Sequence, residues 1–332
     1  MACLNTCKRT LCPSLENGRN RLKLFYYRRP DRLNNFGDDL NLWLWPRLLP
    51  DVFDEAETAV FVGIGTVLNG LLNRRLPRNC AIAIFSSGVG YERGLPLLNA
   101  AAKIYCLRGP LSARQLGVPE DLAVTDGAIL VRRCFQAPTE KVHTVAFMPH
   151  IHHAIYGETL WPALCDRIGF GYIDPRWPVA QVLTAIAQTK LLLAEAMHGA
   201  IIADALRIPW IPIRTSARIL AFKWQDWCAS LELDYRPSFL SPWIGQYPRI
   251  AGGIRSTLPP ALHWWRWLQQ DRLRSAGLLF QDDGAAVAKQ LLRIARTRRP
   301  CLSPCDRLET LTVQLEERLE RFKTDVAAGY FG

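Results

Sequence analysis

The hydrophobic pattern of the chain alternates short apolar runs with longer segments of helical periodicity. The apolar runs predict buried strands, and helical patterns follow at residues 40–49, from Ser112, and at 158–168, 177–188 and 198–206. Continuous apolar strands separated by helices are typical of parallel sheets that helices cover on both faces. The sequence therefore predicts an α/β fold. The expected strands are 22–28, 58–65, 79–88, 103–110, 143–148, 169–173, 190–194 and 209–213.

The alternation breaks around residues 131–140 and restarts at His143, so we expect a domain boundary there. Two doubly wound domains that face each other across a cleft are the simplest interpretation. The chain then divides into a flexible N-terminal arm (1–20), a first domain (21–138), a second domain (139–255) and a helical C-terminal extension (256–332). The extension ends in an amphipathic helix near 306–325.

Composition narrows the classes of protein that the chain can belong to. Apolar residues make up 49% and charged residues 21% of 332, which excludes a disordered or fibrous chain. No apolar run approaches the roughly 18–20 residues that cross a bilayer, and the first residues lack the pattern of a signal peptide, so we expect a cytoplasmic protein. The ten cysteines are unevenly spaced, which favours reduced thiols over a zinc module.

The net charge of +11 points to an anionic partner, which can be nucleic acid, an anionic membrane surface or a phosphorylated small molecule. Ligands of open parallel sheets bind beyond the carboxyl ends of the strands. The loops expected there carry four of the six histidines and three arginines. These loops are Asn34–Asp39, Gly63–Thr66, Ser86–Gly90, Arg108–Pro110, Pro149–His153, Glu195–Gly199 and Arg214–Arg218.

His198 and Arg108 are the strongest individual candidates. His198 follows an apolar strand and opens a helix, where its imidazole can transfer a proton near neutral pH; a half-buried structural histidine is the alternative. Arg108 ends a strand, where its guanidinium can bind a carboxylate or a phosphate; a surface ion pair is the alternative. Arg214, Arg218 and Lys223 can add positive charge opposite Arg108.

Other polar residues in these loops admit two interpretations. His150, His152 and His153 can hold a metal or hydrogen-bond a substrate, and the second is favoured because no acidic partner has ligand spacing. One of Asp38 and Asp39 is expected to cap a helix, while the other is free to act as a base. The glycines lack the dinucleotide fingerprint and instead allow close approach of the backbone to a ligand or a helix, or form tight turns.

Seven motifs in this order resemble the polysaccharide pyruvyl transferases, in particular the exopolysaccharide-type branch, over about residues 22–225. They are Asn35-Phe-Gly-Asp-Asp-Leu-Asn, Gly63-Ile-Gly-Thr-Val-Leu, Ser87-Gly-Val-Gly, Arg108-Gly-Pro-Leu-Ser-Ala-Arg, Thr125-Asp-Gly-Ala, Tyr172-Ile-Asp-Pro and Glu195-Ala-Met-His-Gly-Ala-Ile-Ile-Ala-Asp-Ala. The resemblance implies two Rossmann-like domains in a GT-B-like arrangement. It also implies transfer of pyruvate from phosphoenolpyruvate onto a sugar as a ketal, without metal or cofactor.

The resemblance also implies roles for individual residues. His198 supplies a proton as general acid, Asp38 or Asp39 binds or deprotonates the acceptor, and Arg108 with Arg218 or Lys223 holds the anionic donor. The acceptor is expected to be a lipid-linked glycan precursor, which fits a cytoplasmic protein with peripheral contact to the inner membrane surface. The further residues expected to bind substrate are Asn35, Gly37, Gly65, Gly88, His150, Glu195 and Gly199.

Two rival functions remain to be weighed. A GT-B-type glycosyltransferase that uses a nucleotide sugar shares the fold, but the paired glutamates eight residues apart are absent, because Ala203 lies eight residues after Glu195. A nucleic-acid-binding protein would fit the charge and the 11 tryptophans, but no recognition module is apparent and we expect no nucleic-acid partner. The C-terminal segment has two interpretations: its aromatic and basic residues either bind an anionic membrane surface or pack against the two domains. These residues are Trp264, Trp265, Trp267 and the cluster Arg293–Arg299.

Overall fold

The computed structural model describes residues 21–331 apart from Ala56, 92–93, 99–100, 217–218 and 241–283. The expected N-terminal arm, Arg218 and the tryptophans at 264–267 therefore lie outside the described residues. No helix within the described ranges is both long and apolar enough to cross a membrane.

Five parallel strands form the sheet of the first domain. Their spatial order is β2 (Phe53–Asp54), β1 (Leu22–Phe25), β3 (Ala59–Val62), β4 (Ala81–Ser87) and β5 (Ala102–Leu107). All four residues of β3 are buried, as a strand covered on both faces requires. The helical elements of this half are α1 (Phe36–Leu48), α2 (Leu72–Arg75), α3 (Pro110–Leu116), η1 (Glu120–Leu122), η2 (Gly127–Leu130) and α4 (Val131–Cys134).

The second domain also contains a parallel five-stranded sheet. Its order is β10 (Ser238–Phe239), β9 (Trp210–Arg214), β8 (Leu192–Ala194), β6 (Ala146–Met148) and β7 (Gly171–Tyr172). The helices that connect these strands are α5 (Ile151–Tyr156), α6 (Leu160–Arg167), α7 (Val179–Ala187), α8 (Met197–Ala205) and α9 (Ala221–Ser230).

The two sheets share one topology. Counted within each domain, both have the strand order 2-1-3-4-5, so chain direction across the sheet reverses beside β1 in the first domain and beside β6 in the second. The predicted α/β class with two parallel sheets is confirmed. The GT-B-like arrangement of the domains stays a prediction.

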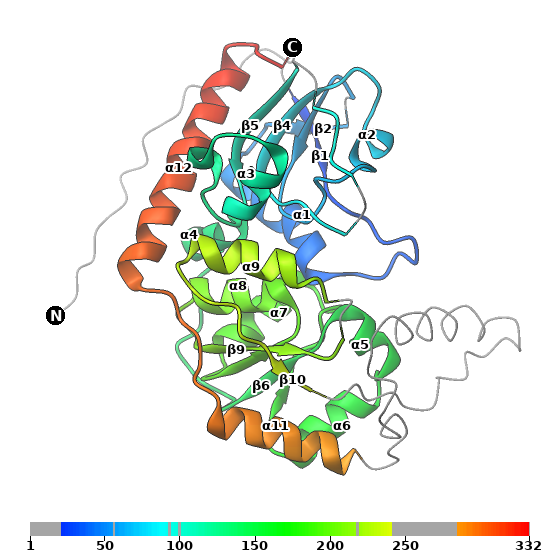
Figure 1. Ribbon diagram of the computed structural model, residues 1–332, viewed down its shortest axis with the longest axis vertical. Coiled ribbons are helices and arrows are strands. Elements are labelled where there is room, and N and C mark those ends of the chain that lie inside the picture. Colours follow the sequence, from blue (N-terminus) through cyan, green and yellow to red (C-terminus); the bar gives the residue numbers. More distant parts are fainter. Residues whose placement is uncertain are drawn as a thin grey trace, which may run out of the picture.

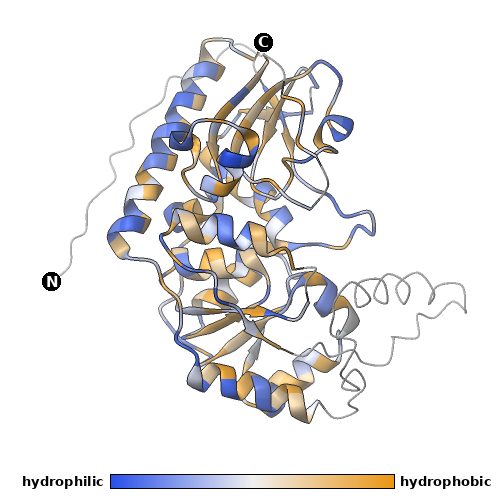
Figure 2. Cartoon of the chain, in the orientation of Figure 1, coloured by the Kyte–Doolittle hydropathy of each residue, from blue (hydrophilic) through white to orange (hydrophobic). Residues whose placement is uncertain are grey.

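The two domains meet across a continuous apolar core. Leu40 and Leu44 of α1 belong to the same buried cluster as Val182 of α7 and Ile201 of α8. The backbone N–H of Phe36 donates to the carbonyl of Pro175 at 2.8 Å, which joins the start of α1 to the loop after β7. In Figure 2 the strands of both sheets are largely apolar, whereas blue segments recur along the outer helices.

The C-terminal residues connect both domains (Figure 1). Helix α11 (Ala285–Thr297) packs into the second domain, with Leu291 and Ile294 in its core. The backbone of Cys301 then forms an antiparallel β-bridge with Trp210 of β9, and α12 (Cys305–Ala327) runs along the first domain. Phe322 of α12 contacts the rings of Phe61 and Tyr105. Residues 285–331 therefore form a strap that spans the two sheets.

Candidate functional site

The topology brings the polar loops of both domains to their switch points. In the first domain these segments follow β1 and β3 and contain Asn35, Gly37 at the start of α1, and Gly65. In the second domain they follow β6 and β8 and contain His150 and, at the start of α8, His198. Crevices outside the carboxyl ends of strands at such points are where open α/β sheets bind ligands.

The start of α1 is held by its own polar residues. Asn35 occupies the N-cap position; its backbone N–H donates to Asp39 at 2.9 Å and its side-chain amide donates to Asp38 at 2.5 Å. The expectation that Asp38 or Asp39 caps the helix is therefore wrong, because the cap lies three residues before Asp38. Both aspartates lie in the first turn, where their negative charges interact favourably with the positive end of the helix dipole.

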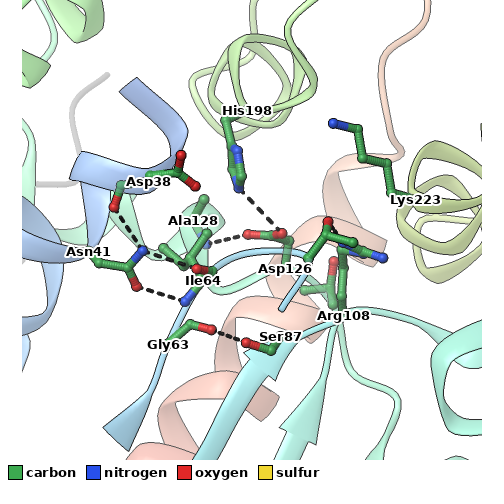
Figure 3. Close-up of polar contacts among 12 residues, drawn as sticks. Asp38, Asn41, Gly63, Ile64, Ser87, Arg108, Asp126, Ala128, His198 and Lys223 are labelled. Atoms are coloured by element: carbon green, nitrogen blue, oxygen red, sulfur yellow. Dashed lines mark hydrogen bonds and ion pairs between the residues drawn. The ribbon is translucent and has the colours of Figure 1, made fainter. Parts of the chain in front are cut away.

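Asn41 fastens α1 to the glycine loop after β3 and was missed by sequence reasoning. Its buried amide donates to the carbonyls of Asp38 and Ile64, and its oxygen accepts from the N–H of Ile64 at 2.8 Å and from the indole of Trp45. Figure 3 shows this residue between α1 and the loop. Its place as the last residue of the quoted Asn35–Asn41 motif was the available signal.

Asp38 carries a strongly perturbed carboxyl group. Burial raises its pKa to about 6, against the lowering effects of the Asn35 amide and of the positive charges of His198 and Lys223. Burial likewise raises the pKa of Asp39, against the hydrogen bond from Asn35 and the charge of Arg28. A carboxyl that titrates close to neutral pH can accept a proton at working pH.

His198 lies on the second domain but faces the first. It is the second residue of α8, its side chain is 15% exposed, and its Nε2 lies 3.7 Å from an oxygen of Asp126. Gly37 packs against the other edge of the ring, where an added Cβ would stand 2.2 Å from Nδ1. Figure 3 shows the imidazole descending from α8 between Asp38 and Asp126.

Asp126 is a second residue that sequence reasoning missed as a site residue. Its side chain is fully buried, and one oxygen caps η2 by accepting from the N–H of Ala128 at 3.0 Å. It belongs to the quoted Thr125–Ala128 motif, but nothing in the spacing pointed to His198, which lies far along the chain in the other domain.

Arg108 is enclosed rather than open. Its Nε donates to Asp226 at 3.0 Å, and its terminal nitrogens donate to the hydroxyl of Thr66 at 2.6 Å and to the carbonyl of Val89 at 3.2 Å. The side chain has no exposed surface, and an added Cβ at Gly88 would stand 2.2 Å from the guanidinium. The structure thus gives Arg108 a buried ion pair between α9 and the first domain, while donor binding by this residue stays a prediction.

Lys223 supplies a positive charge that acts on Asp38 of α1. Its side chain is largely buried, and its ammonium group donates to the hydroxyl of Tyr91 at 2.5 Å. Its charge lowers the pKa of both Asp38 and His150. Lys223 therefore acts electrostatically on both halves of the site; Figure 3 shows its side chain together with those of Asp38 and His198.

His150 and Glu195 belong to one hydrogen-bonded unit of the second domain. His150 caps α5, its N–H donates to Glu195 at 2.8 Å, and burial with the charges of His152 and Lys223 holds its pKa well below the ordinary value. Burial alone would raise the pKa of Glu195, but the charge and hydrogen bond of His153 and the hydrogen bond from the Thr215 hydroxyl have the larger effect, so its pKa is lowered.

No cluster of side chains that could hold a metal occurs within the described ranges.

The remaining predicted glycines have structural contacts. The carbonyl of Gly65 accepts from the N–H of Gly88 at 2.9 Å, which brings two of the predicted loops together. Gly65 has a φ of +143°, a conformation that favours glycine. Gly199 lets α8 approach β6, because a Cβ there would stand 2.5 Å from the sulfur of Met148.

Comparisons with known proteins identify a family that the sequence matches. A sequence model of the family described as polysaccharide pyruvyl transferase matches residues 17–216. The chain is 44% identical over 207 residues to the succinoglycan biosynthesis protein ExoV of Rhizobium meliloti (strain 1021), over 61% of this chain and 63% of that protein. No solved structure matches the chain. Lys223 and Asp226 lie beyond the segment that the family model covers.

Proposed function

Because the chain belongs to the polysaccharide pyruvyl transferase family, we propose that it transfers pyruvate from phosphoenolpyruvate to a glycan in exopolysaccharide synthesis. The acceptor that we propose is a lipid-linked precursor, bound at the carboxyl ends of both sheets. The similarity to a succinoglycan biosynthesis protein supports a polysaccharide as the final product.

One observation carries this proposal. His198 from α8, Asp38 from α1 and Lys223 from α9 come together from two domains, with the charges of His198 and Lys223 both acting on Asp38. An acid, a base and a cation are the groups that a ketal transfer from an anionic enol ester requires.

In the first step, His198 gives a proton to the methylene carbon of phosphoenolpyruvate. The new C–H bond forms as the N–H bond breaks, and the neighbouring carbon becomes electrophilic. A sugar hydroxyl attacks this carbon and loses its proton to Asp38, whose pKa near 6 suits it to accept one at neutral pH. Phosphate then leaves and takes up the proton held by Asp38, and a second hydroxyl of the same sugar closes the cyclic ketal and gives its proton to the neutral His198.

The donor has a carboxylate and a phosphate that need positive charge. We propose that Lys223 holds one of them, with Arg214 at the end of β9 as a further cation. Direct contact of Arg108 with the donor belongs to the same proposal; in the structure its guanidinium is paired with Asp226. The N-terminal end of α8, which carries His198 and Gly199, adds backbone N–H groups that favour an anion.

A nucleotide-sugar glycosyltransferase is the alternative reaction on this fold, and the two reactions differ in the donor consumed. Purified protein is incubated with phosphoenolpyruvate or a sugar nucleotide and with lipid-linked oligosaccharides from an exopolysaccharide-producing cell. We expect phosphate release only from phosphoenolpyruvate, and a mass gain on the glycan equal to pyruvate less water. Consumption of the sugar nucleotide instead would contradict the proposal.

The role of His198 has its own test. In the variant His198→Gln we expect turnover to fall on the order of 10²-fold or more, while phosphoenolpyruvate still binds. His143→Gln is the matched control, since this histidine pairs with Thr189 before β6, away from the carboxyl ends of the strands. Equal activity of the two variants would remove His198 as the general acid.

A further inference from the structure

The two nitrogens of the His198 ring lie in different surroundings. Nε2 is buried without a hydrogen-bond partner among the described residues, and it faces Asp126 across the domain boundary. Nδ1 is not one of the buried unpartnered atoms, and it lies on the edge of the ring that faces Gly37, where there is no room for a side chain. Because the side chain is 15% exposed while Nε2 is buried against Asp126, Nδ1 is the nitrogen through which the ring can meet a substrate.

Asp126 is a rigid partner for Nε2. Its Oδ1 is engaged by the N–H of Ala128, whereas its Oδ2 is buried without a partner and points at His198. Gly127 packs against Ser86 and Trp45, so the loop that carries the carboxylate has little room to move. Two buried polar atoms without partners that face each other at 3.7 Å need only a shift of under ~1 Å to form a hydrogen bond.

We propose that Asp126 is a positioning residue that keeps a proton on Nε2 of His198, so that Nδ1 is the nitrogen that gives its proton to the substrate. This inference rests on the proposed function and makes it more specific. The acid is then complete only when the two domains are docked, because its nitrogen atoms face Asp126 and Gly37 of the first domain while its backbone belongs to the second.

The proton balance of the step is simple. The imidazolium carries one proton on each nitrogen; the Nδ1–H bond breaks as the C–H bond of the pyruvyl methyl group forms. The neutral ring that remains keeps its Nε2–H toward the Asp126 carboxylate. Asp38 of α1 is the other charged group that acts with His198, and Lys223 of α9 acts on Asp38 in turn.

The first test is the tautomer of the resting protein. Protein labelled with ¹⁵N-histidine is examined by NMR above pH 8, and the His198 signals are assigned by their loss in His198→Gln. We expect the neutral ring to carry its proton on Nε2. A ring protonated on Nδ1 overturns the proposal, and this measurement needs no substitution at Asp126.

The second test separates positioning from folding. Asp126→Asn is compared with Asp121→Asn, which removes an exposed carboxylate from η1 of the same domain. We expect Asp126→Asn to mix the two tautomers and to lower kcat on the order of 10²-fold, with the dissociation constant for phosphoenolpyruvate within threefold of wild type. Unchanged kcat, or a loss that appears in donor binding instead, overturns the proposal.

Gly37→Ala gives an independent check at the other edge of the ring. Its Cβ would stand 2.2 Å from Nδ1 and must displace the imidazole, so we expect kcat to fall on the order of 10²-fold while Asn35 still caps α1. Wild-type kcat in Gly37→Ala would contradict access at Nδ1. If the wild-type protein releases no phosphate from phosphoenolpyruvate, the proposed function itself fails; if it does, but Asp126→Asn and Gly37→Ala keep full activity, this inference alone fails.

Discussion

Asp38 is a site residue that lowers the free energy of unfolding while it contributes to the proposed reaction. The folded state raises its pKa to about 6, mainly because the carboxyl is removed from water, whereas an unfolded aspartate titrates near 3.9. Between these values the folded state binds more protons than the unfolded state. The free energy of unfolding therefore falls as pH rises from about 4 to about 6, and this cost persists at higher pH.

Replacing Asp38 with Asn removes that cost. We expect Asp38→Asn to be more stable than wild type by on the order of 1–2 kcal/mol at pH 7–8, with no gain near pH 4. Turnover should fall, because an amide cannot accept the hydroxyl proton. Urea unfolding at pH 4, 5, 6 and 7.5 with matched initial rates measures both effects. A constant stability difference across this range would show that the carboxyl is not perturbed as described.

Single residues also mark the limit of sequence reasoning. The positions of Asp38, Gly37 and His198 near the carboxyl ends of strands, in the first turns of α1 and α8, could be predicted, because topology alone brings strand ends together. The pairing of His198 with Asp126 could not be predicted, since it depends on how the two domains dock. The burial of Arg108 could not be predicted either, because its partner Asp226 lies on a helix that the hydrophobic pattern did not indicate.

That helix, α9, is the element on which the periodicity argument failed. It buries Lys223 and Asp226 together with Trp224 and Trp227, so charged and apolar residues do not separate onto two faces. The charges are buried because they have partners in the first domain, Tyr91 and Arg108. By contrast, β3 and β4 were found within a few residues of their bounds, since strands covered on both faces are largely apolar.

The ion pair between Arg108 and α9 leads to a prediction about stability. Arg108→Ala would leave Asp226 as a buried charge without its cation, so we expect a loss of about 3–5 kcal/mol in the free energy of unfolding. Adding Asp226→Asn should recover part of this loss, because the amide carries no charge. Urea unfolding of the single and double variants measures the recovery. A double variant less stable than Arg108→Ala would contradict this account of the pair.

The buried ion pair of Arg108 affects how the activity of Arg108 variants is interpreted. An inactive Arg108→Ala protein does not show that Arg108 touches the donor, because loss of the pair disturbs the junction of α3 and α9. Arg108→Lys keeps the charge, so its dissociation constant for phosphoenolpyruvate, measured below the unfolding temperature, is the informative quantity. Tenfold or greater weakening without a change in the circular dichroism spectrum would indicate donor contact.

At the scale of the whole molecule, the strap and the shared core make the two sheets interdependent. The C-terminal amphipathic helix was predictable from its periodicity, but its position was not, because α12 packs on the first domain although it follows the second in sequence. Its buried face belongs to the same cluster as Trp45 of the first domain and Trp210 of the second. Contacts between segments so distant in the chain leave no local pattern.

This arrangement predicts that a substitution in α12 weakens both domains at once. Phe322 is fully buried against Phe61, Tyr105 and Phe331, so Phe322→Ala should cost about 3–5 kcal/mol. Val313→Ala on the same helix, at a side chain that is 42% exposed, should cost less than about 0.5 kcal/mol. Hydrogen exchange then discriminates the mechanism: β4 and β8 should lose protection together in Phe322→Ala, because one cluster stabilises both sheets. Loss confined to β4 would mean that the domains unfold separately, and assembly of the His198–Asp126 pair would not depend on the strap.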